Sequence, residues 1–231
     1  MRLTVIIPAY NEDKTISRVL KRVLVNKLVR EIIVVNDGST DGTKTQIAKC
    51  KAQNKKIKII NKAKNEGKGT AIRDALKIAK GDTFIIQDAD LEYDPNEYPQ
   101  VLGPIMAGKA DVVFGSRFVG NQPHRVLYFW HFVGNKFITL LANTITNLNL
   151  TDMETCYKAF TRDVAKKLGL QEKRFGFEPE FTIKTAKMGV RIYEVGISYS
   201  GRSYSEGKKI NWKDGLWTVW CLFKYSALNI F

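Results

Sequence analysis

The chain has 231 residues, of which 44% are hydrophobic and 26% charged, so it can bury a globular core and is not expected to be disordered. Lysine and arginine outnumber aspartate and glutamate by 37 to 23, and the net charge of +14 favours polyanionic partners such as nucleic acid, phosphorylated substrates or an acidic membrane surface. Three separated cysteines and two histidines disfavour a disulfide framework, a zinc site and histidine-rich metal chemistry, and they fit a reducing compartment.

The sequence shows neither a signal peptide nor a membrane-spanning segment. Met1 and Arg2 lead directly into a strand-like apolar run, without the charged leader and cleavage site of a signal peptide. The two most apolar stretches, residues 126–150 and 215–231, are interrupted by polar residues or fall short of the roughly 20 apolar residues that span a bilayer. We therefore expect a cytoplasmic protein that is not by itself an integral membrane chain.

The first half of the chain alternates short β-branched runs with segments of helical periodicity. The expected strands are residues 3–7, 31–35, 58–60, 83–87 and 112–114, and the expected helices are residues 15–25, 41–51 and 69–79. This alternation predicts an α/β fold with a mostly parallel sheet and helices on both faces. In such sheets ligands bind beyond the carboxyl ends of the strands, which is where the polar clusters of this sequence fall.

The pattern changes after about residue 120. We expect helices over residues 126–147 and 212–228, a strand over residues 191–198 and a polar loop over residues 201–207. No linker separates the halves, so we predict one domain over residues 1–231, with residues 1–117 binding nucleotide and metal and residues 118–231 binding the acceptor. The aromatic residues of this half suit either a buried core or helices on a membrane surface; they lie in residues 128–132 and at Trp212, Trp217, Trp220, Phe223 and Tyr225.

The strongest chemical signal follows the expected strand at residues 83–87. Asp88 and Asp90 stand two residues apart at its end, and Glu92 follows two residues later. Oxygen ligands of this kind hold Mg²⁺ or Mn²⁺, and a metal held there can neutralise charge on a nucleoside-diphosphate leaving group. An acidic surface turn is the usual explanation of an isolated D-x-D, but the position at a strand end favours the metal site.

Two further clusters suit nucleotide binding. Asp37, within residues 34–42, can accept hydrogen bonds from a base or ribose, although an Asx-turn with a helix cap explains it equally. Lys68 stands between two glycines at the start of a helix, which is typical of a turn around phosphate, although the spacing is not that of a P-loop.

Taken in order, these motifs resemble glycosyltransferase family 2, whose members have a Rossmann-like GT-A nucleotide-sugar transferase fold. The matching segments are residues 5–12, 36–41, 65–69, 88–90 and 115–117. Within the family the chain is most similar to the polyprenyl-phosphate glycosyltransferases, such as the dolichyl-phosphate mannosyltransferases.

The resemblance implies roles for particular residues. The nucleotide-binding set is Pro8, Tyr10, Glu12, Asp37, Lys68 and Asp88. The metal ligands are Asp88, Asp90 and Glu92, where Glu92 departs from the Gln frequent in mannosyltransferases. The catalytic set is Asp88, Asp90 and Arg117. The acceptor-phosphate set is Arg117 with Arg202 and Lys208, the last two from a basic loop at residues 201–210.

The nature of the acceptor decides whether a base is needed. A phosphate monoester is already anionic and needs only cationic positioning, which Arg117, Arg202 and Lys208 could supply. A sugar hydroxyl needs a carboxylate base. Glu178 and Glu180 lie where many relatives carry that base, and they are either the base or residues that orient the basic loop.

The sequence thus predicts a metal-dependent inverting glycosyltransferase. It would move a hexose from a GDP- or UDP-sugar, such as GDP-mannose or UDP-glucose, to a dolichyl or undecaprenyl phosphate at the cytosolic face of a membrane. The chain would dock peripherally or through a separate membrane protein. The alternative is a soluble family 2 transferase acting on a sugar hydroxyl of a polysaccharide or glycolipid. Nucleic acid is not an expected partner, because the acidic strand ends would repel it.

Overall fold

The computed structural model describes residues 1–120, 122–126, 128–203, 206 and 212–227, and its strands form one sheet. The strands are β1 (Leu3–Ala9), β2 (Val29–Asn36), β3 (Ile57–Asn61), β4 (Thr83–Ile86), β5 (Val112–Ser116), β6 (Lys158–Thr161) and β7 (Ile192–Gly196). Their order is β3-β2-β1-β4-β6-β5-β7, and β6 alone is antiparallel to its neighbours, β4 and β5. The mostly parallel sheet predicted from the sequence is confirmed.

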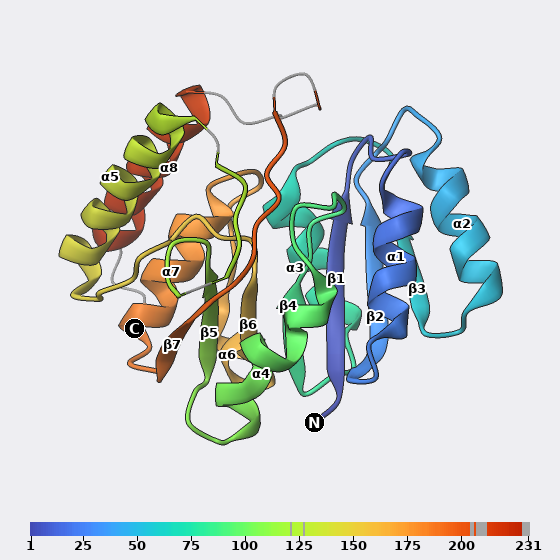
Figure 1. Cartoon of the computed structure of the whole chain (residues 1–231), viewed down its shortest axis with the longest axis horizontal. Coiled ribbons are helices and arrows are strands. Elements are labelled where there is room, and N and C mark those ends of the chain that lie inside the picture. The colour runs from blue at the N-terminus through green and yellow to red at the C-terminus, as the bar shows by residue number, and fades with distance from the viewer. Residues whose placement is uncertain (121, 127, 204–205, 207–211, 228–231) are drawn as a thin grey trace.

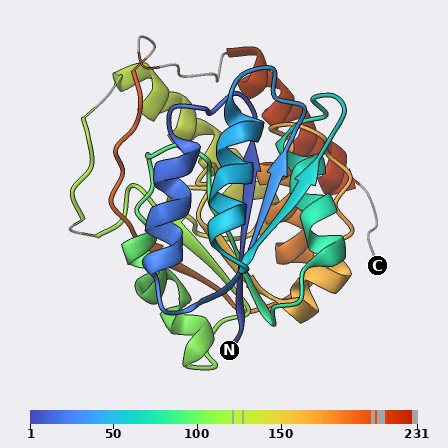
Figure 2. The ribbon, with the colours of Figure 1, turned by 90° about the vertical axis from the view of Figure 1, so that its right-hand side faces the viewer.

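Helices cover both faces of this sheet, as predicted. They are α1 (Ile16–Val25), α2 (Thr43–Gln53), α3 (Lys68–Ile78), α4 (Tyr98–Met106), α5 (Phe129–Thr146), α6 (Arg162–Leu168), α7 (Phe177–Lys187) and α8 (Trp212–Ala227), with a short 3₁₀ helix η1 (Pro95–Glu97). The views show α1, α2 and α4 on one face and α3, α6 and α7 on the other (Figures 1 and 2). Helices α5 and α8 lie side by side at the opposite end of the molecule from α2 (Figure 1).

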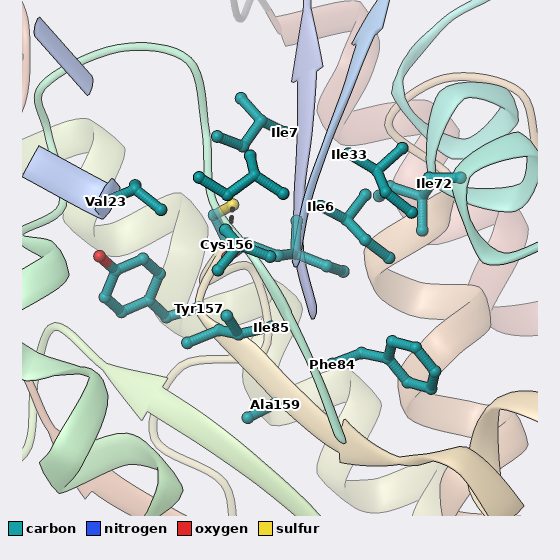
Figure 3. Close-up of a cluster of buried hydrophobic side chains, with 14 of the residues drawn as sticks. Ile6, Ile7, Val23, Ile33, Ile72, Phe84, Ile85, Cys156, Tyr157 and Ala159 are labelled. Atoms are coloured by element: carbon teal, nitrogen blue, oxygen red, sulfur yellow. Dashed lines mark hydrogen bonds between the residues drawn. The ribbon is translucent and has the colours of Figure 1, made fainter. Parts of the chain in front are cut away.

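The central strands are apolar throughout because both of their faces are buried. Successive residues of a strand point to opposite faces. Ile7 accordingly lies on the side of Val23 from α1, whereas Ile6 lies on the side of Ile33 and of Ile72 from α3 (Figure 3). All of these side chains are fully buried. Burial of both faces fixes the register of the sheet, and with it the position of every strand end.

Strand β6 was not predicted from the sequence. Its first residue, Lys158, is fully buried in the middle of the sheet, and a lysine interrupts the apolar run that marks a central strand. The Lys158 ammonium donates to the main-chain oxygens of Met153, at 2.9 Å, and of Thr155. The buried charge thereby ties down the loop that precedes the strand.

A second apolar cluster joins α5, α7 and α8. Its buried members are Ala142, Met153, Ile183, Cys221, Leu222 and Tyr225. The Tyr225 hydroxyl donates to Glu172 at 2.9 Å, so this aromatic residue belongs to the core and not to a surface. The opposite sides of the two helices are exposed, with Trp130 at 78% and Trp220 at 58% of full accessibility. Among the described residues no helix is both long and apolar enough to cross a membrane.

The turn that opens α3 packs closely against residues 172–174. Gly67 has a φ of +94°, and a Cβ atom there would overlap the main chain of Lys173. A Cβ atom at Gly69 would overlap the carbonyl oxygen of Glu172. Close packing alone therefore explains why glycine stands at both positions, whether or not a phosphate binds there.

This packing predicts opposite effects for two helical glycines. Gly69→Ala should lower the free energy of unfolding by about 1–3 kcal/mol, because the new methyl group forces the 172–174 segment away. Gly134→Ala in α5 should raise it by about 0.5–1 kcal/mol, because beyond the helix's own adjacent backbone no atom of the described residues lies within 4 Å of the new methyl group. Urea unfolding of both variants measures the difference, and equal effects would contradict the close approach.

Candidate active site

A cavity of about 450 Å³ collects most of the predicted site residues from both halves of the chain, but not Glu180. Its lining includes Pro8, Tyr10, Glu12, Asp37, Lys68, Asp88, Asp90, Glu92, Arg117, Glu154, Glu178, Tyr199 and Arg202. Gln87, at the end of β4, is buried and accepts hydrogen bonds from Tyr98 at 2.8 Å and from Tyr157 at 2.7 Å. These bonds fix the strand end from which Asp88 and Asp90 reach the cavity.

Lys68 joins two acids within the cavity. Its ammonium lies 3.1 Å from Asp88 Oδ1 and 2.9 Å from Glu178 Oε1. Burial opposes the charge of Lys68, but the neighbouring Asp88 and Glu178 raise its pKa well above the usual value. Burial likewise opposes the charge of Asp88, yet Lys68 keeps the Asp88 pKa below its ordinary value. The pair is therefore ionised, and Lys68 is a half-buried cation at the first residue of α3.

Arg202 contacts three further carboxylates. Its guanidinium lies 2.6 Å from Asp90, 3.2 Å from Glu92 and 3.3 Å from Glu12. The predicted acceptor-phosphate residue thus lies directly against residues predicted to bind metal and nucleotide. Burial, followed by the charges of Glu92 and Asp88, raises the pKa of Asp90 well above its usual value even beside Arg202. This part of the cavity carries more negative charge than its own cation offsets.

The donor chemistry fits a divalent cation at Asp88 and Asp90. Mg²⁺ typically takes one or two protein carboxylates together with substrate phosphates, and the crowded charge at Asp90 would be relieved by a cation. Glu92 is engaged elsewhere, since it accepts from the Tyr199 hydroxyl at 2.9 Å and from the Arg202 main-chain N–H at 2.9 Å. Within the described ranges no group of three His, Cys, Asp or Glu side chains is placed to hold a metal.

Asp37 supports the turn before α3. Its carboxylate accepts from the main-chain N–H groups of Glu66 at 3.1 Å and of Gly67 at 2.7 Å, and it lies 3.2 Å from the Lys62 ammonium. It lines the cavity while both of its oxygens already have protein partners.

Arg117 reaches the cavity as a paired cation. Asp152 holds its guanidinium by two bonds of 2.7 Å and its main-chain N–H by a third of 3.0 Å. The guanidinium also lies 5.1 Å from the centre of the Tyr199 ring. The two bonds to Asp152 fix the plane of the guanidinium, so Arg117 is preorganised to contact a ligand in the cavity.

The two glutamates of the 175–180 segment have different surroundings in the structure. Glu178 lines the cavity. Glu180 does not: it is fully buried, accepts from the main-chain N–H groups of Gln171 at 2.7 Å and of Glu172 at 2.8 Å, and pairs with Lys184 at 2.6 Å. Glu180 therefore orients the 171–172 segment, and Glu178 is the one placed to touch a ligand. Lys208 and the Trp212 side chain lie outside the described residues.

Glu154 is a cavity residue that the sequence analysis missed. It lies in the loop between α5 and β6, where no periodicity marks it. Burial, followed by the charge of Glu178, raises its pKa to about 8. Asp152 and Glu154 stand two residues apart shortly before a strand, and this spacing was the only local signal for the site.

The chain matches the family described as Glycosyl transferase family 2 over residues 4–169. It is a member of that family. This family 2 glycosyltransferase is 30% identical to undecaprenyl-phosphate mannosyltransferase of Micrococcus luteus over 218 residues, which cover 90% of this chain and 87% of the relative. It is 27% identical to dolichol-phosphate mannosyltransferase of Pyrococcus furiosus, with 91% of this chain and 61% of the relative covered.

Its fold is the GT-A fold of such enzymes. Glucosyl-3-phosphoglycerate synthase of Mycobacterium tuberculosis, solved with Mn²⁺, UDP and glucosyl-3-phosphoglycerate, aligns with a TM-score of 0.74 at 20% identity. The alignment covers 98% of this chain and 80% of the synthase. The family and fold implied by the sequence motifs are confirmed.

The raised pKa of Glu154 predicts a pH-dependent stability. The carboxyl should stay protonated in the folded state up to about pH 8 but ionise near its ordinary value of 4.5 when unfolded. Its favourable contribution to the free energy of unfolding is therefore complete below pH 4.5 and is lost as the pH rises to about 8. Glu154→Gln should lack this decline, as urea unfolding at several pH values would show. Parallel profiles for both proteins would contradict the shift.

Proposed function

We propose that this family 2 glycosyltransferase is a metal-dependent, inverting enzyme that moves a hexose from a GDP- or UDP-sugar to a polyprenyl phosphate. The observation that carries the proposal is the contact between Asp90 and Arg202 in one cavity. It brings a residue suited to the donor's metal next to a cation suited to an acceptor phosphate. The mannosyltransferase relatives, whose printed names include undecaprenyl and dolichol phosphate, support this acceptor class.

The donor would lie over the ends of β1 and β4. Asp88 and Asp90 would hold Mg²⁺ or Mn²⁺, which when bound neutralises charge on the departing diphosphate. Pro8, Tyr10 and Glu12 line the same cavity and would contact the nucleotide, together with the turn that Asp37 supports.

The acceptor phosphate would be positioned by cations and would need no protein base, because it is anionic at neutral pH. Arg117 and Arg202 both line the cavity, and Lys208 would join them. Arg202 is already paired with Asp90, Glu92 and Glu12, so a phosphate bound to it would compete with these carboxylates for its charge. The binding of donor and acceptor is therefore expected to be coupled.

The exposed sides of α5 and α8 would meet the membrane that contains a polyprenyl acceptor. They present Phe129 and Trp130 from α5 and Trp217, Trp220 and Phe223 from α8. Aromatic residues beside lysine and arginine favour the interface of an anionic leaflet. The chain would lie at the cytosolic face, directly or through a separate membrane protein.

A sugar hydroxyl is the second candidate acceptor, and Glu178 supports it. One oxygen of this buried carboxylate has no hydrogen-bond partner among the described residues, and the side chain lines the cavity. A base for a hydroxyl acceptor could be placed there.

The acceptor is tested by transfer of radiolabelled sugar. The protein, Mn²⁺ and labelled GDP-mannose or UDP-glucose are incubated either with a short-chain polyprenyl phosphate or with a panel of sugar acceptors. We expect label in the lipid phosphate. Product on the sugar acceptors alone would contradict the lipid assignment and favour the second candidate.

The metal site is tested by substitutions that follow β4, with a control substitution just before the same strand. Replacing both Asp88 and Asp90 by alanine should lower kcat/KM by about 100-fold or more, because the diphosphate charge is no longer offset. Asp82→Ala, an exposed aspartate just before the same strand, should leave turnover unchanged. Undiminished and still metal-dependent turnover in the double variant would contradict the site.

A further inference from the structure

Two carboxyl groups of the cavity have an oxygen without a partner. Glu154 Oε1 and Glu178 Oε2 are shielded from solvent, and the described residues offer neither of them a hydrogen bond. Buried polar atoms are almost always paired, so each exception requires an explanation. A third such atom, Glu97 Oε2, belongs to a residue outside the cavity lining. Two acids that line one cavity, each with one unpaired oxygen, indicate a ligand that supplies the missing partners.

The protein itself holds the main chain on either side of Glu154 and the side chain of Glu178. The main-chain oxygens on either side of Glu154, in Met153 and Thr155, accept from the buried Lys158 ammonium. Glu178 lies in the first turn of α7 and is fixed by Lys68 at 2.9 Å. The two acids are therefore carried by segments that the protein fixes through hydrogen bonds and an ion pair.

The charge state of the pair selects the kind of ligand. Burial and the charge of Glu178 raise the pKa of Glu154 to about 8, so Glu154 is protonated at neutral pH, whereas Glu178 is paired with the Lys68 ammonium at 2.9 Å. A protonated carboxyl donates and accepts, whereas a carboxylate only accepts. Phosphate would be repelled by Glu178, and the described residues place no third acid or histidine to complete a metal site here. Hydroxyl groups, which donate and accept, match the pair.

We propose that Glu154 and Glu178 form the subsite that binds the hydroxyl groups of the transferred hexose. The assignment rests on the proposed function, in which the donor is a nucleotide sugar. Lys68 joins Glu178 to Asp88, where the diphosphate would lie. The hexose attached to that diphosphate would thus reach the Glu178 side of the cavity. The pair would determine which sugar the enzyme accepts, since a hydroxyl of the wrong configuration leaves a buried acid unpaired.

Calorimetric binding measurements on the whole chain with Mn²⁺ test the subsite. The ligands are GDP and GDP-mannose, and UDP and UDP-glucose. In each pair the ratio of the two Kd values gives the gain in affinity from the sugar. Glu154→Leu should reduce that gain by about tenfold or more and leave the affinity for the nucleoside diphosphate within about twofold. Glu178→Gln should also reduce the gain by more than it lowers the affinity for the diphosphate, which lies on the side of its partner Lys68. Glu154→Gln, which keeps a donor and an acceptor, should lose less than Glu154→Leu.

Glu97→Gln is the matched control, because it changes a half-buried carboxyl outside the cavity lining that also has one unpaired oxygen, and it should alter neither affinity. Thermal unfolding confirms that each variant is folded. The subsite would be overturned, while the proposed function stands, by any of three results. The folded variants could keep the wild-type gain in affinity from the sugar, or they could lose affinity for the diphosphate and the sugar nucleotide equally. The wild-type protein could also show a ratio of Kd values near one. Failure of the wild-type protein to bind any of the four ligands would overturn both. A base acting on an acceptor hydroxyl would change turnover without changing donor affinity.

Discussion

The burial of several carboxylates in one cavity is the constraint on which this site depends. Glu12, Asp88, Asp90, Glu92, Glu154 and Glu178 all line it. A buried charge is costly unless it is paired, and Lys68 and Arg202 provide the pairing that the structure shows. The pKa values of Asp90 and Glu154 nevertheless stay raised. The site is therefore acidic in excess of its own cations, although the chain as a whole carries a net charge of +14.

This excess connects the fold to the chemistry. The parallel strands β1 and β4 end at the same edge of the sheet, so Glu12, which follows β1, lies close to Asp90, which follows β4. Because both faces of the sheet are buried, the strand ends cannot easily move apart, and the acids that follow them stay close together. A metal ion would relieve the imbalance at Asp90, and the hydroxyl groups of the transferred sugar would supply partners for the unpaired oxygens of Glu154 and Glu178. An acceptor phosphate would instead compete with the carboxylates for Arg202.

The sequence predicted what depends on local pattern. The strand-end position of Asp88 and Asp90 followed from an apolar run and from the geometry of parallel sheets, and the family followed from the ordered motifs. Strand β6 was missed because Lys158 interrupts its apolar pattern, and only the folded chain shows which oxygens satisfy that lysine. The pairing of Arg202 with Asp90 spans 112 residues and has no local signature. Glu154 was missed because its role depends on Glu178, a neighbour in space but not in sequence.

The central claim is that the acids at the end of β4 need a cation beyond those of the protein. Electron paramagnetic resonance of Mn²⁺ tests it directly, because the signal of the free hydrated ion falls as the ion is bound. Titration of the protein with Mn²⁺ in the presence of a nucleoside diphosphate should show one bound ion per chain. Replacement of Asp88 and Asp90 by asparagine should abolish that binding in a folded protein. Equal binding by the wild-type and substituted chains would contradict the account.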